Sequence, residues 1–274
     1  MKKQLLIAAV AASMTSVAMA DVSITGASKF NVKDSVTSYS TDLMIAGKSG
    51  DTTANYKLKM TGTGFETETA TVTTSISGVK VKAGAWKSGA NELDHESTTA
   101  VNRFNVSTAM GGVKVAVEAD AADSSMDVSV SGTIAGVAIA HKENSNDSSE
   151  TTVSASFGGV DISVNQEEAA NGDENTATTV STEMNGIALK YVKIDSDAGT
   201  VTDGYVGNTS GVKDASAFGI STSVGGNKVT MKAIEINGTD NTKFIVTRPL
   251  NGATFEATYD DNAESLDLEL AVKF

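Results

Sequence analysis

The sequence predicts an all-β fold, a transmembrane antiparallel up-and-down β-barrel of about 18 strands, with 16 strands as the alternative. Three observations predict it: an export leader, an apolar–polar alternation of period two, and glycine turns at nearly regular intervals. The 274 residues include no cysteine and one proline, and their net charge is −13. The missing cysteine excludes disulfides, thiolate metal sites and thiol nucleophiles. The acidic balance argues against nucleic acid as a partner.

The first 20 residues have the three parts of a secretory signal. Lys2 and Lys3 are followed by a short apolar run over residues 5–12 and by the small residues Ala18 and Ala20 of an A-x-A site. The run is too short to span a bilayer, which takes roughly 20 residues. We expect cleavage after Ala20, so residues 1–20 are a signal peptide and residues 21–274 form a single barrel domain. Loss of two lysines and no acid changes the net charge from −13 to −15.

The remaining chain alternates apolar and polar residues, as a strand with one apolar face requires. The end of the chain shows this most clearly, because an apolar residue stands at every second position. These residues are Leu266, Leu268, Leu270, Val272 and Phe274. Upstream segments around residues 56–60, 79–85, 113–118 and 187–192 repeat the pattern, and none sustains the i, i+3, i+4 spacing of a helix.

Eight tight glycine turns punctuate these strands. Glycine and asparagine supply the positive φ of two-residue hairpin turns at the least cost. The turns are predicted at Gly50, Gly78, Gly112, Gly136, Gly159, Gly186, Gly226 and Gly252. Most intervals are close to 25 residues, which holds two strands of about ten residues and one looser connection. Each of the eight turns joins two strands, which gives sixteen strands, and one more strand at each end of the chain gives 18.

A soluble sandwich would also have strands with one apolar face. Three features favour a barrel in a membrane: lysines on the polar faces, few large aromatic residues to fill a core, and consecutive hairpins without a helix or domain break. Closure also removes the sheet edges that lipid cannot satisfy. The longest connections are predicted at residues 88–100 and 195–215.

The terminal strand ending in Phe274 resembles the C-terminal assembly signal of Gram-negative outer-membrane barrels. With the leader and the hairpin repeat, the chain resembles the Gram-negative porin family of general diffusion porins. The resemblance implies short periplasmic turns, longer external loops, and a water-filled channel for ions and small hydrophilic solutes. It also implies surrounding outer-membrane lipid and lipopolysaccharide, the barrel assembly machinery, a homotrimer and no cofactor. Interface aromatics would come from Trp86, Phe104, Phe157, Tyr191, Phe244, Phe255, Tyr259 and Phe274.

In porins of this family the third external loop narrows the lumen and presents acids opposite a basic wall. The third loop here is the segment 87–100, and the resemblance assigns Glu92, Asp94 and Glu96 to the constriction. Strand parity places a basic wall nearby, and it consists of Lys57, Lys59, Lys80, Lys82 and Arg103. Opposed charges would create a transverse field that favours small polar solutes. The alternative is an ordinary solvated loop and an ordinary polar wall.

Other functions have less support in the sequence. Asp195, Asp197, Gly199 and Asp203 resemble the start of a calcium loop, but Val206 stands where glutamate is required, so a solvated loop is favoured and no metal is expected. No G-x-S-x-G or phosphate-loop motif occurs, and we expect no enzyme. A secreted structural or adhesive all-β surface protein is the alternative function, and the terminal Phe274 strand argues against it.

Overall fold

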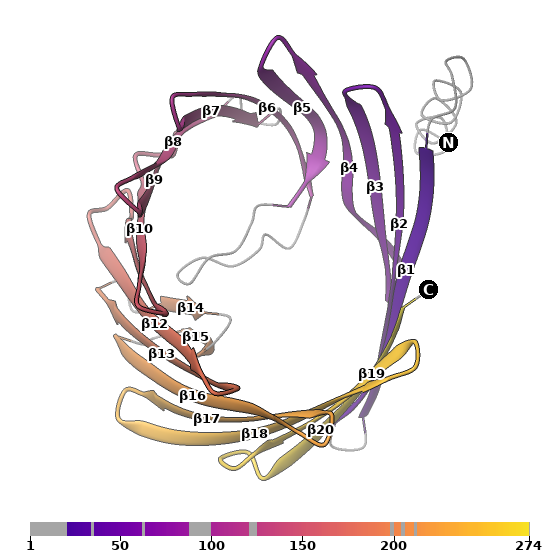
Figure 1. Cartoon of the computed structure of the whole chain (residues 1–274), viewed down its shortest axis with the longest axis vertical. Coiled ribbons are helices and arrows are strands. Elements are labelled where there is room, and N and C mark those ends of the chain that lie inside the picture. The colour runs from indigo at the N-terminus through magenta and orange to yellow at the C-terminus, as the bar shows by residue number, and fades with distance from the viewer. Residues whose placement is uncertain are drawn as a thin grey trace.

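The computed structural model describes residues 21–33, 36–61, 64–87, 100–120, 125–197, 200–203, 206–210 and 213–273. Eighteen of its strands form one antiparallel sheet that closes on itself, and β14 and β15 form a separate hairpin inside the ring (Figure 1). The predicted fold class and the count of 18 strands are therefore confirmed. The described residues include no helix that is long and apolar enough to cross a membrane.

The strands are 4 to 14 residues long. Their bounds are β1 Asp21–Lys33, β2 Val36–Ser49, β3 Thr52–Thr61, β4 Gly64–Ile76, β5 Val79–Trp86, β6 Val101–Met110, β7 Val113–Asp120, β8 Met126–Ile134, β9 Val137–Glu143, β10 Ser149–Phe157, β11 Val160–Glu168, β12 Glu174–Met184, β13 Ile187–Ser196, β14 Thr200–Asp203, β15 Gly207–Ser210, β16 Asp214–Val224, β17 Asn227–Ile236, β18 Thr239–Leu250, β19 Ala253–Asp260 and β20 Ser265–Lys273.

Each wall strand pairs with the next one in the sequence, and β13 pairs with β16 across the inserted hairpin. The last strand, β20, pairs with the first, β1, over seven residues from Ala27–Lys273 to Lys33–Asp267. This seam satisfies both outer strands at once, so the described sheet has no open edge. In a bilayer that closure is required, because lipid offers no hydrogen-bond partner to a free strand edge.

All eight predicted glycine turns are present, and they lie at one end of the barrel, which we call the turn end. Gly111 and Gly112 have φ of 61° and 83°, and Asn185 and Gly186 have 53° and 76°. Positive φ at both central residues is the geometry that matches the twist of hairpin strands. The longer connections lie at the opposite end, the loop end. Some connections at the loop end are as short as the turns, and one of these is the pair Asn237 and Gly238, which joins β17 to β18 with φ of 49° and 78°.

The two faces of the sheet differ in polarity. On β7, Val113, Val115 and Val117 are 43, 40 and 36% exposed, and they point outward. Their register partners on the neighbouring strands include Val106, Val128 and Val130, so the valines form a continuous apolar band. The residues between them on β7 point inward and include charged groups. An apolar exterior and a polar interior fit a barrel surrounded by lipid.

Candidate pore and its charged lining

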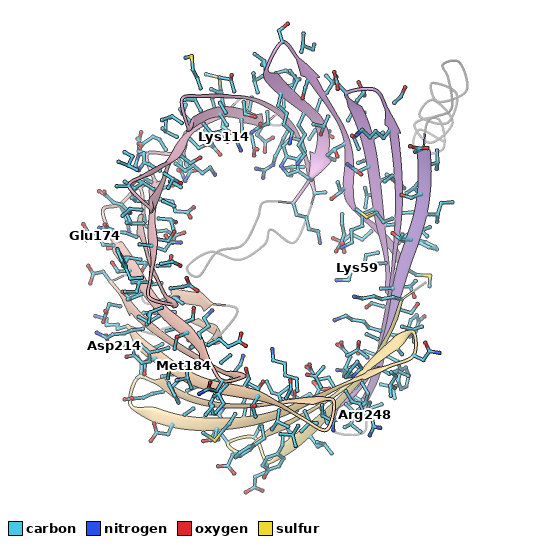
Figure 2. All side chains as sticks on the ribbon, in the orientation of Figure 1. Lys59, Lys114, Glu174, Met184, Asp214 and Arg248 are labelled. Carbon is cyan, nitrogen blue, oxygen red and sulfur yellow. The ribbon has the colours of Figure 1, made fainter. Side chains whose placement is uncertain are left out.

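The five predicted wall residues, Lys57, Lys59, Lys80, Lys82 and Arg103, all lie on the inward-facing side of their strands. Cross-strand partners share a face of the sheet. Lys82 pairs with Asn105 and Lys80 with Ser107 across β5 and β6. Lys59 is labelled on the inner side of β3 in Figure 2. The same face also carries acids, so the inner wall at these positions is mixed rather than uniformly basic.

Glu68 forms the centre of a charged cluster on this wall. Its carboxylate lies 2.5 Å from Nζ of Lys57, 3.4 Å from Nζ of Lys87 and 3.8 Å from Nζ of Lys59. Asp42 on β2 lies 3.5 Å from the same Lys57 ammonium. Glu68 is 8% exposed, which places a buried carboxylate among three cations. The positive charges of Lys57 and Lys59, two of the predicted wall residues, are therefore largely neutralised.

A β-bulge on β4 explains why Glu68 faces inward. The register with β3 shifts beside Lys57, where Glu68 has no partner of its own. Glu66 and Glu68 have the same parity as Val72 and Ile76, which face outward. In a regular strand the two acids would therefore face lipid. The extra residue of a bulge reverses the parity, so the acids face the lumen and the apolar residues keep the outer face.

Gly84 on β5 allows the neighbouring strand to approach closely at this point. Its φ is +133°, and it pairs with Thr71 on β4. A Cβ on Gly84 would overlap the carbonyl oxygen of Ala70 and lie 2.9 Å from Cα of Thr71. Only glycine fits this position without moving the backbone.

Lys87 follows β5 and continues the cluster toward the loop end. Its Nζ lies 3.1 Å from Oε1 of Glu66 and 3.4 Å from Oε1 of Glu68. Burial lowers the pKa of Lys87, but the hydrogen bonds and charges of the two glutamates outweigh it and raise that pKa above its ordinary value. The ammonium therefore remains charged at the base of the third loop. The constriction residues predicted on that loop, Glu92, Asp94 and Glu96, lie outside the described residues.

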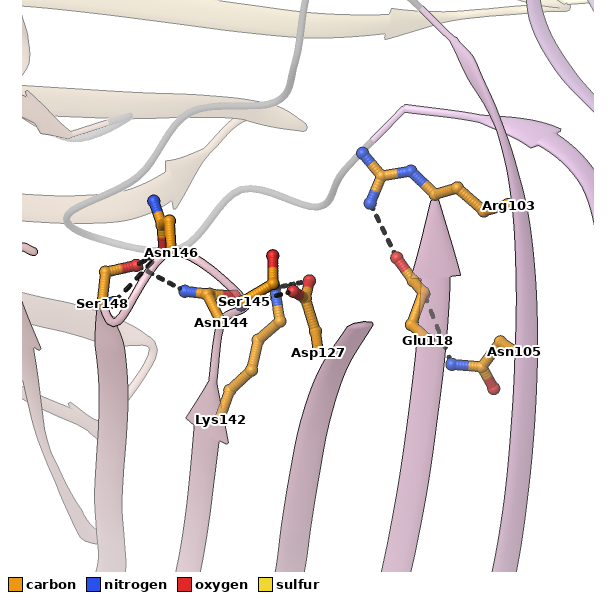
Figure 3. A network of polar contacts seen from close by, with 9 residues as sticks. All are labelled: Arg103, Asn105, Glu118, Asp127, Lys142, Asn144, Ser145, Asn146 and Ser148. Carbon is orange, nitrogen blue, oxygen red and sulfur yellow. Dashed lines mark hydrogen bonds and ion pairs between the residues drawn. The ribbon is translucent and has the colours of Figure 1, made fainter. Parts of the chain in front are cut away.

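A second ion pair lies on β6 and β7. Nη1 of Arg103 donates to Oε1 of Glu118 at 2.7 Å, and Nδ2 of Asn105 donates to Oε2 of the same carboxylate at 3.3 Å (Figure 3). Nε of Arg103 is buried and finds no acceptor among the described residues. This arrangement fixes the guanidinium against the wall. A third ion pair joins β8 and β9, where Nζ of Lys142 lies 3.1 Å from Oδ2 of Asp127.

The position of Trp86 differs from the predicted one. It has the same parity on β5 as Lys82, and the Lys82 ammonium lies 3.9 Å from the centroid of its ring. The side chain is 8% exposed and faces inward, so the expectation that it contributes to an interface girdle is wrong. A cation over an aromatic face is attracted by the ring quadrupole. By contrast, Phe104, Phe157 and Tyr191 are 48, 66 and 40% exposed on the outer face.

Part of the inner wall is apolar, which the sequence analysis did not predict. Val192 and Ile194 on β13 are fully buried although they face the lumen. Val206, at the tip of the β14–β15 hairpin, covers them and is 5% exposed. The full buried cluster consists of Ala177, Val192, Ile194, Val206, Ala215, Ala217 and Ile234. The hairpin thus lies against the wall through hydrophobic contact. The sequence did contain a signal for this apolar patch, because Val192 and Ile194 have the same strand parity as the inward-facing Lys190.

Backbone bonds hold the base of this hairpin. Ser196 N donates to Lys213 O at 2.8 Å, and Asp197 N donates to Glu174 O at 2.9 Å. Asp195, the first residue of the weak calcium pattern, lies on the outer face and pairs with Lys193 at 2.9 Å. The parts of the chain that the structure describes contain no group of three histidine or acidic residues that could hold a metal.

The inner wall is hollowed beside the Glu68 cluster. A hollow of about 520 Å³ is lined by Thr25, Gly26, Ala27, Asp42, Met44, Lys57 and Lys273. Oδ1 of Asp42 is buried and has no hydrogen-bond partner among the described residues.

The predicted assembly signal lies on the seam strand. Leu266, Leu268, Leu270 and Val272 share the outer face of β20, and Leu270 pairs with Phe30 across the seam. Phe274 lies outside the described residues.

Comparison with known proteins identifies the class of fold. No protein-family model matches the chain, and no curated protein sequence does. Solved structures do match. A mutant of the Rh. blastica porin has a TM-score of 0.59 at 12% identity, over 93% of this chain and all of that one. Two other structures match similarly. A Y282R/D307H variant of OccD1 (OprD) has a TM-score of 0.64 at 9% identity, over 94% of this chain and 95% of that one. Pseudomonas aeruginosa OccD3 (OpdP) has a TM-score of 0.62 at 11% identity, over 92% of this chain and 90% of that one. At these identities the similarity shows that the chain has the fold of bacterial outer-membrane porins.

Proposed function

We propose that this protein is an outer-membrane porin that forms a water-filled channel for passive diffusion of ions and small hydrophilic solutes. The observation that carries the proposal is the closed 18-strand barrel with an apolar outer face and a charged inner face. A barrel of this size encloses more space than its inner side chains fill. The similarity to solved porins supports the same function, and we infer a channel rather than an enzyme.

The adhesive alternative receives no support from the fold. A secreted sheet protein in water would have to bury its apolar strand faces against a second sheet. The described sheet instead leaves residues such as Val115 and Val130 exposed around its circumference.

We propose further that residues 1–20 are removed on export and that the barrel is inserted by the assembly machinery in contact with lipid and lipopolysaccharide. A trimer is the proposed assembly. Two hydroxyl pairs on the outer face of β1 to β4 support a protein contact there, namely Ser28 with Thr41 at 3.0 Å and Thr52 with Thr74 at 2.9 Å.

Single-channel recording of the purified protein in a planar bilayer in 1 M KCl tests the proposal. We expect discrete, long-lived current steps, and steps in groups of three if the trimer is correct. A folded, β-rich protein that never conducts would contradict the channel function.

Deletion of Phe274 tests the assembly signal. We expect less folded protein in the outer membrane, because Phe274 continues in the sequence the apolar alternation of Leu266 to Val272. The control is Phe157→Ala, which removes an aromatic side chain that is 66% exposed on the outer face. Equal membrane yields for the Phe274 deletion and the unaltered chain would contradict the assignment.

A further inference from the structure

Five lysines face the lumen at the turn end of the barrel. Each stands two residues from a tight turn, except for the one at the end of β20. They are Lys48, Lys80, Lys114, Lys228 and Lys273. All five are exposed, and none forms an ion pair with another described residue. Lys114 is labelled in Figure 2. Among the described residues, the inward-facing acids nearest this end are Asp21, Asp161 and Glu183, so the lysines outnumber the acids there.

The inner face toward the loop end has the opposite character. Four of its bases are paired with acids: Lys29 with Glu269 at 3.0 Å, Arg103 with Glu118 at 2.7 Å, Lys142 with Asp127 at 3.1 Å, and Lys243 with Asp260 at 3.1 Å. A fifth base, Lys33, faces inward at the end of β1 and has Asp267 as its register partner. Further carboxylates share this face, namely Asp120, Glu150, Glu167 and Asp267. Among the described residues, the inward-facing acids near the loop end therefore outnumber the bases.

We propose that the pore is electrically polar along its axis and that it conducts more current in one direction than in the other. The inference rests on the proposed channel function and adds a directional property to it. An acidic segment admits cations and repels anions, and a basic segment does the reverse. Two such segments in series form a junction inside the pore.

The order of the acidic and basic segments along the pore determines which voltage polarity gives the larger current. When the loop side is positive, cations enter through the acidic segment and anions enter through the basic one, so both ions accumulate at the junction. When the loop side is negative, both ions are drawn out and the junction is depleted. The current is therefore larger when the loop side is positive. A wall potential of about kT/e changes local ion concentrations severalfold, so a current ratio of about 2 is expected at low salt.

Single-channel recording at equal positive and negative voltages measures this ratio. In 0.1 M KCl the screening length is about 10 Å, and in 1 M KCl it is about 3 Å. We expect a ratio of about 2 in the first solution and close to 1 in the second. Orientation is assigned with Ser145→Cys, which is exposed at the loop end of a chain without cysteine. A biotin attached there binds streptavidin only from the loop side.

The quadruple variant K48Q/K80Q/K114Q/K228Q should lower the ratio toward 1 in 0.1 M KCl. The control is Lys193→Gln, which removes a lysine from the outer face and should leave the ratio unchanged. If the quadruple variant does not assemble, Lys114→Gln and the salt dependence of the unaltered channel decide the question. Equal currents at both polarities in 0.1 M KCl would overturn the inference alone. Absence of any conductance in 1 M KCl would overturn the proposed function and this inference with it.

Discussion

Replacing Gly84 with alanine should destabilise the barrel strongly, because the new methyl group has no space and the backbone has an unusual conformation. The φ of +133° costs an L-residue about 1–3 kcal/mol. The overlap with Ala70 O forces β4 and β5 apart, and overpacking of this kind costs about 1–3 kcal/mol more. The expected loss is therefore about 2–6 kcal/mol in the free energy of unfolding.

Denaturant unfolding in detergent micelles measures this loss. Trp86 is the chain's single tryptophan and lies two residues from Gly84, so its fluorescence reports local opening while far-ultraviolet circular dichroism reports the whole sheet. The matched control is Gly112→Ala. Gly112 has φ of +83° but no atom within 4 Å of the added Cβ, so it isolates the backbone cost. Equal losses for the two variants would refute the argument that Gly84 is required by the close approach of β4.

Three further predictions concern the lumen. Val206→Asp should increase the frequency of transient closures in single-channel records, because a carboxylate cannot remain in the apolar cluster under the hairpin. The control Val206→Leu should leave the closure frequency unchanged. Equal closure frequencies for the two variants would contradict hydrophobic docking of the hairpin. Glu68→Gln should shift the reversal potential in a salt gradient toward anions and lower the free energy of unfolding by about 1–3 kcal/mol, since Lys57 and Lys87 lose their shared carboxylate. Neutralising Glu92, Asp94 and Glu96 together should shift the reversal potential in the same direction, and an unchanged value would remove these acids from the constriction.

The fold could be predicted from the sequence because its signals are local. Glycine at positions such as Gly112 and Gly226 marks a turn by itself, and the parity of a strand such as β20 follows from alternation alone. Each hairpin repeats the same short-range pattern, so the strand count followed from the turns. The inward placement of Lys57, Lys80 and Arg103 has the same origin.

The missed features depend on exceptions to that parity or on contacts between distant residues. The bulge at Glu68 reverses parity within one strand, and alternation cannot show where such a reversal occurs. Trp86 was assigned by residue type to the interface, although its parity with Lys82 already placed it inside. The docking of Val206 depends on how the connection between β13 and β16 folds back. The partners of the wall lysines, including Asp42, lie on other strands and depend on register.

The seam between β1 and β20 has a consequence for the order of folding. Every other wall pair joins neighbours in sequence, but Asn31 and Asp267, which share a hydrogen bond at 2.6 Å, are 236 residues apart. Relative to a segment of about 25 residues, closing a loop of that length costs about 2 kcal/mol more in chain entropy. The hairpins can therefore form in any order, whereas the seam can form only after the last strand is available. Until then the edge of β1 that faces away from β2 has no partner strand. A truncated chain would therefore be arrested as an open, aggregation-prone intermediate rather than as a narrower pore.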